Sequence, residues 1–212
     1  MKTSAVLLLV ALLFTYCNFS DKTRENAAQE RTPEELWKEE KAKQDSIDNL
    51  VYDKMQKTAF GDFVFGMNKT QVAELNVEKE KLGKYNYSLS PRFTNQDELY
   101  QLTLKSSGVK AIKFESDLSG NYTNLFKIIE TRYGAPLMQK KFPSVFDVQE
   151  SNKYLMSKWE QGTKIIAISL VENNLNSYAV VCDIFDSNMS AAEKERLNKF
   201  KNKDITEAAE KF

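Results

Sequence analysis

An amphipathic helix with a sharp end is the feature that most restricts how this chain can fold. Apolar residues between positions 122 and 133 recur at spacings that place them on one helix face, so the helix must cover another apolar surface. Gly134 ends the helix, and Pro136 prevents its continuation. The apolar face consists of Tyr122, Leu125, Phe126, Ile129 and Tyr133.

Three strands expected after this helix form the surface that it covers. They lie near residues 152–160, 163–171 and 177–185, and Gln161 with Gly162 is typical of a tight hairpin between the first two. Strands joined by hairpins form an antiparallel sheet, which keeps one apolar face for helices to cover.

The same order of a short helix and three strands is expected earlier in the chain. Asn68 caps a short helix that carries Val72 and Leu75 inward, and Gly108 suits the turn of a hairpin. We therefore predict an α+β fold: an antiparallel sheet with helices packed on one face, built from two helix-plus-three-strand units. The strands expected in this part lie at 60–66, 84–90, 97–105 and 109–117.

Helices are expected to flank this domain at both ends. Thr32 and Glu35 form a capping box at the start of the first, and Ser190 and Glu193 form another at the start of the last. Apolar residues in the second half of the first helix should dock it on the body; they are Ile47, Leu50, Val51 and Met55. The expected organisation is a signal peptide (1–17), a flexible tether (18–31), an N-terminal helix (32–58), the α+β domain (59–187) and a C-terminal helix or tail (188–212).

The first residues of the chain have the pattern of a secretory signal peptide. Lys2 precedes an apolar run from Ala5 to Phe14, which is typical of the hydrophobic region of a signal peptide. A helix needs roughly 20 apolar residues to span a bilayer, and this run is shorter. The alternative is a buried N-terminal strand or helix. We expect export, with the mature chain periplasmic or anchored to a membrane by lipid.

Cys17 is the candidate lipidation site. It stands where the apolar run ends and a polar stretch begins, a layout that resembles a bacterial lipoprotein signal. Acylation there would anchor the chain to a membrane. The alternative is cleavage by an ordinary signal peptidase just after Cys17. In both cases Cys182 has no partner for a disulfide, and its strand-like neighbours indicate a small buried residue.

Composition excludes several classes of function. The chain has no histidine and two cysteines, which excludes Ser-His-Asp and Cys-His catalysis and histidine-based zinc sites. Basic and acidic residues number 30 each, so no basic excess indicates nucleic-acid binding. Phosphate-binding glycine motifs are absent from the sequence. We predict no cofactor, no metal site and no catalytic residue; the oligomeric state is left open.

Carboxylates are the remaining candidates for chemistry. Glu115 with Asp117, and Asp183 with Asp186, lie close in sequence near expected strand ends, where an acid–base pair could form. We expect them instead to be solvent-facing strand residues. Asp183 is singled out because burial on its side of the strand would raise its pKa.

Two short motifs resemble those of a known group of proteins. Residues 65–68 (Phe-Gly-Met-Asn), followed by Val72, resemble the opening of a capped helix, and residues 133–136 (Tyr-Gly-Ala-Pro) resemble a helix ending. From about residue 60 to 185 the chain looks like small exported bacterial proteins of unknown function, many of them predicted lipoproteins. Its units also resemble the tandem-unit folds of outer-membrane assembly lipoproteins of the SmpA/OmlA type and of β-lactamase-inhibitory proteins. The resemblance implies a binding or scaffolding module outside the cytoplasm and carries over no catalytic residue.

These observations favour an exported, non-enzymatic binding or scaffolding module of the cell envelope, with an envelope protein as its expected partner. The alternatives are a carrier of a small apolar ligand and a carboxylate-based enzyme. A large apolar pocket beneath the 122–133 helix would favour the carrier, and a cleft with several carboxylates would favour the enzyme.

Overall fold

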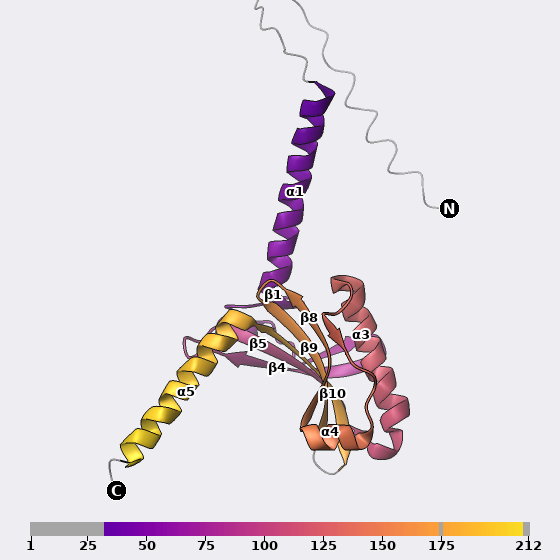
Figure 1. Ribbon diagram of the computed structural model, residues 1–212, viewed down its shortest axis with the longest axis vertical. Coiled ribbons are helices and arrows are strands. Elements are labelled where there is room, and N and C mark those ends of the chain that lie inside the picture. The colour runs from indigo at the N-terminus through magenta and orange to yellow at the C-terminus, as the bar shows by residue number, and fades with distance from the viewer. Residues whose placement is uncertain (1–31, 174–175, 210–212) are drawn as a thin grey trace, which may run out of the picture. The chain divides into compact units, whose positions relative to one another are not determined.

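The computed structural model describes residues 32–173 and 176–209, with side chains as far as residue 199 (Figure 1). The chain divides into two compact units with a boundary after Gln44, and every strand lies in the second unit. Cys17, the expected signal peptide and the expected tether lie outside the described residues. No helix in the described ranges is long and apolar enough to cross a membrane.

The first helix, α1 (Pro33–Lys57), is capped as predicted but does not dock as predicted. Glu35 N–H donates to Thr32 Oγ1, and the Thr32 N–H donates to the Glu35 carboxylate. No residue of α1 is buried, and Leu50 is 67% exposed. The expected docking of Ile47, Leu50 and Val51 is therefore wrong, whereas Met55 in the last turn is partly buried. Ion pairs one turn apart, such as Lys38 with Glu34, support a helix that has few packing contacts.

The strand expected at 60–66 is instead a small hairpin of β1 (Thr58–Phe60) and β2 (Phe63–Val64). Gly61 has a φ of +54°, and this left-handed conformation turns the chain where a continuous strand was expected. The short helix α2 (Lys69–Glu74) follows with the predicted capping box between Asn68 and Gln71.

Two antiparallel three-stranded meanders make up most of the main sheet, which confirms the predicted α+β fold. The third strands of the two meanders, β5 and β10, pair with each other at the centre. The first meander comprises β3 (Lys79–Leu82), β4 (Tyr85–Phe93) and β5 (Leu99–Ser106). The second comprises β8 (Lys153–Gln161), β9 (Lys164–Asn173) and β10 (Ser177–Asp186), and the short β7 (Met138–Gln139) extends its edge.

The strand expected at 109–117 is wrong beyond its first two residues. Only β6 (Val109–Lys110) is extended, and it pairs with β10 instead of β5, so the expected hairpin at Gly108 does not form. A 3₁₀ turn (Ala111–Lys113) and a π-helical turn (Phe114–Leu118) then lead into α3 (Ser119–Tyr133). Phe114 and Leu118 are both buried, and their spacing continues the apolar face of α3 by another turn.

Two further helices differ from expectation in their bounds. The loop expected after residue 136 contains α4 (Val145–Ser151), which Ser144 caps. The last helix, α5 (Ser187–Ala209), begins before the predicted cap at Ser190. The Asp186 carboxylate accepts a hydrogen bond from the Met189 N–H, so the aspartate closes the start of this helix, while Ser190 is buried.

The hydrophobic core lies between α3 and one face of the sheet (Figure 1). The Phe126 and Trp159 rings pack with centroids 5.3 Å apart. Tyr122 shares a 2.7 Å hydrogen bond with Ser157, so a polar contact also joins helix and sheet. Trp159 Nε1 donates to the carbonyl of Gly134 at 2.9 Å, which fixes the end of α3.

Replacement of Phe126 by Ala tests this packing. Phe126 is 9% exposed, so its removal should lower the free energy of unfolding by about 3 kcal/mol through lost burial and a new cavity. Phe146→Ala is the matched control because that side chain is 74% exposed, and it should change stability by less than about 0.5 kcal/mol. Urea unfolding of both variants measures the difference; equal losses would contradict the packing described.

Candidate functional site

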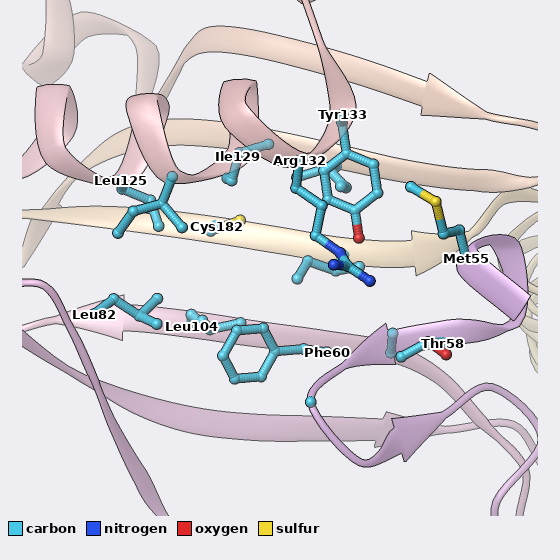
Figure 2. A pocket seen from close by; sticks show the side chains of 15 residues that line it. Met55, Thr58, Phe60, Leu82, Leu104, Leu125, Ile129, Arg132, Tyr133 and Cys182 are labelled. Carbon is cyan, nitrogen blue, oxygen red and sulfur yellow. The ribbon is translucent and has the colours of Figure 1, made fainter. Parts of the chain in front are cut away.

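An apolar pocket of about 250 Å³ lies beneath α3. Its roof comes from α3, and its floor comes from the central strands of the sheet, with the β1 turn and the last turn of α1 closing one end (Figure 2). No acidic side chain lines it. The lining residues are Met55, Thr58, Ala59, Phe60, Gly61, Leu82, Leu104, Leu125, Ile128, Ile129, Arg132, Tyr133, Ile166, Cys182 and Ile184.

The pocket exists because short side chains face a long helix. Cys182 stands opposite Leu104 in the pairing of β10 with β5, so both side chains point to the same face of the sheet. A thiol there fills less space than the branched residues around it. Ala59 and Gly61 add little volume at the end near α1, so the side chains there leave space between α3 and the sheet unfilled.

Lys164 is buried at the same end of the pocket. It is 1% exposed, and its Nζ donates to the Thr58 carbonyl at 2.6 Å and to the Tyr133 hydroxyl at 2.7 Å. A third, longer contact of 3.5 Å reaches the Met55 carbonyl. The ammonium also lies 4.8 Å from the centroid of the Tyr133 ring. Neutral groups from two segments of the chain, around residues 55–58 and at Tyr133, thus hold this cation.

No carboxylate pairs with Lys164 within the described part of the chain. Asp186 is its cross-strand neighbour, but that carboxylate accepts from Thr163 Oγ1 at 2.6 Å and from the Met189 N–H. Burial, followed by repulsion from Arg132, lowers the pKa of Lys164 to about 8. The lysine is therefore mostly protonated at neutral pH.

Arg132 and Tyr133 place a guanidinium and a hydroxyl group at this end of the pocket. Figure 2 shows the Arg132 guanidinium beside the Tyr133 hydroxyl, on the side of the pocket near Met55 and Thr58. Burial raises the pKa of Tyr133, and the neighbouring Arg132 side chain opposes that shift. The tyrosine hydroxyl is thus protonated at neutral pH and able to donate a hydrogen bond.

Cys182 is a protonated thiol in the pocket floor. It is fully buried, and this burial raises the pKa of the thiol far above its ordinary value. Its surroundings agree with the sequence interpretation of a small buried residue.

The carboxylates named from the sequence do not converge on the pocket. Asp183 follows Cys182 in β10, so its side chain points to the opposite face of the sheet. There it accepts from Gln101 Nε2 at 2.9 Å and Thr103 Oγ1 at 2.7 Å and pairs with Lys153. The Asp186 carboxylate accepts the hydrogen bond from the Met189 N–H at the start of α5.

Glu115 and Asp117 lie in the π-helical turn before α3, away from the strand ends expected for them. Asp117 accepts from Ser116 Oγ at 2.9 Å and lies 3.6 Å from Lys113 Nζ. Among the described residues, no group of three or more Cys, Asp or Glu side chains is placed to hold a metal ion.

No family model, curated protein or solved structure matches this chain significantly. The resemblance to SmpA/OmlA-type and inhibitor proteins therefore stays a prediction.

Replacing Lys164 by Met should change how stability depends on pH. Between the lowered pKa of about 8 and the ordinary value of 10.5, the unfolded chain binds more protons at this lysine than the folded chain. The free energy of unfolding of the wild type should therefore rise relative to the variant as pH increases from 8 toward 10, by at most about 1.4 kcal/mol per pH unit.

Urea unfolding at several pH values between 7 and 10 measures this difference. Lys127→Met, at an exposed position on α3, is the matched control and should show no such rise. A difference between wild type and Lys164→Met that is constant over this range would contradict the burial of a charged Lys164.

Proposed function

We propose that this chain is an exported binding module whose pocket beneath α3 holds a small apolar ligand. The observation that carries the proposal is the pocket of about 250 Å³ between α3 and the sheet. A protein partner in the envelope stays a prediction of the sequence, whereas the pocket gives a specific reason to favour the carrier.

The size of the pocket suits a ligand smaller than a typical drug. An engineered protein cavity of roughly 150 Å³ accepts benzene, and pockets for drug-sized ligands begin at roughly 300 Å³. A volume of 250 Å³ lies between these values. Scaling from benzene gives a ligand of about ten non-hydrogen atoms.

The groups that line the pocket support binding more than bond-making chemistry. The Cys182 thiol is held protonated by its burial, so it is a poor nucleophile. Asp183, the carboxylate singled out from the sequence, lies on the other face of the sheet with its oxygens hydrogen-bonded. Most of the pocket surface is aliphatic, which favours the transfer of an apolar ligand from water.

Binding of octan-1-ol tests this proposal. Along a series of alcohols, each added methylene should strengthen binding by about 0.8 kcal/mol, or fourfold, until the chain fills the pocket. Ile128 lines the pocket and is 40% exposed, so Ile128→Trp should occupy the opening and weaken octan-1-ol binding by about tenfold or more.

Ile112→Trp is the matched control because Ile112 is 92% exposed and does not line the pocket. Isothermal titration calorimetry measures all three proteins. Wild-type binding that is absent, or that Ile112→Trp weakens as much as Ile128→Trp does, would rule out the pocket as the binding site.

Export and lipidation belong to the same proposal and depend on the sequence alone. In a bacterial host, the wild-type chain should enter the membrane fraction with an acyl-sized increase in mass, and Cys17→Ser should be soluble. Envelope fractionation and intact mass spectrometry check both points. Two soluble proteins that begin near Asn18 would show ordinary cleavage and disprove the lipid anchor.

A further inference from the structure

The polar atoms of the pocket are gathered at one end, and the rest of its surface is apolar. Figure 2 shows the Arg132 guanidinium and Tyr133 hydroxyl near Met55 and Thr58, while Leu82 and Leu125 lie at the other end. A ligand that matches this surface has one polar terminus and an apolar body.

We propose that the ligand is a single-chain anionic amphiphile, with its alkyl chain beneath α3 and its head group at the end lined by Arg132 and Tyr133, where Lys164 donates to Tyr133. This inference rests on the proposed function, because it assigns a chemical class to the ligand of the same pocket.

The charge at this end favours an anion. Arg132 and Lys164 are close enough for their charges to repel, and no acidic residue lines the pocket. Neither cation forms an ion pair within the described part of the chain. An anionic head group would reduce the repulsion; its attraction to the buried Lys164 is weakly screened, whereas water screens its attraction to the exposed Arg132.

The hydrogen bonds at this end leave donors for a head group. Lys164 Nζ donates to the Tyr133 oxygen, so the hydrogen of that hydroxyl is free to point into the pocket. Arg132 adds a planar guanidinium, whose parallel N–H groups match the two oxygens of a carboxylate. In this arrangement Arg132 and Tyr133 contact the head group directly. Lys164 does not contact it but orients the Tyr133 hydroxyl.

The volume limits the length of the apolar part. About ten non-hydrogen atoms fit by comparison with the cavity that accepts benzene. Octanoate has that size, and octan-1-ol has the same chain with an uncharged head group. Comparing octanoate with octan-1-ol separates the effect of the charge on binding from the effect of the alkyl chain.

The experiment compares octanoate, octan-1-ol and acetate by calorimetry at pH 7 and low ionic strength. The full chain carries Cys17→Ser in all samples, so that detergent, itself an amphiphile, can be left out. We expect octanoate to bind about tenfold or more tightly than octan-1-ol, as for hydrogen bonds to a charged group, and acetate to bind too weakly to detect.

Arg132→Gln and Tyr133→Phe locate the head group. Each should weaken octanoate binding by about tenfold and change octan-1-ol binding by less than about twofold. Arg92→Gln is the matched control because Arg92 is exposed on β4 and does not line the pocket, and it should change neither affinity. Thermal unfolding of each variant confirms that it is folded.

The outcomes separate this inference from the proposed function. Equal binding of octanoate and octan-1-ol would overturn the anionic ligand and leave the apolar pocket in place. A preference for octanoate that persists in both Arg132→Gln and Tyr133→Phe would overturn the assigned head-group site. Absence of binding by either compound would overturn both the inference and the proposed function.

Discussion

The pairing of β5 with β10 is the contact on which the rest of the structure depends. It joins two meanders that are each too small to cover an apolar face, and it makes them one sheet broad enough to support α3. The same pairing places Leu104 opposite Cys182, so the centre of the sheet is also the floor of the pocket. The fold and the candidate site therefore have a common origin.

Sequence patterns predicted the elements whose periodicity is unambiguous. The ranges expected for α3, β8, β9 and β10 lie within a few residues of the observed bounds, although β9 and β10 contain runs of consecutive buried residues and do not alternate. Prediction failed at 109–117, where Ile112 and Phe114 alternate as in a strand but only Phe114 is buried. It also failed for the docking of Ile47, Leu50 and Val51 in α1, because apolar residues clustered in a helix do not determine whether a partner surface lies within reach.

The candidate site was much less predictable than the fold. The hydrogen-bond partners of Lys164, Thr58 and Tyr133, come from distant segments and could not be recognised in the sequence. A lysine at the first position of a strand is ordinarily expected to be a solvent-exposed residue. One signal was present: Lys164 has the same strand parity as Ile166, Ile168 and Leu170, which all face the core. The pocket itself arises from unfilled volume, which no residue pattern encodes.

The pocket and the buried lysine both lower the stability of the empty protein. Unfilled apolar volume loses dispersion contacts, and a buried ammonium loses hydration that neutral hydrogen-bond acceptors replace only in part. Both costs fall at one site, and nothing among the described residues offsets them with a carboxylate or a larger side chain. An anionic amphiphile would offset both costs at once. Its alkyl chain would fill the pocket, and its negative charge would lie near Arg132 and Lys164. A site built only for stability would place a branched side chain at Cys182 and an apolar one at Lys164.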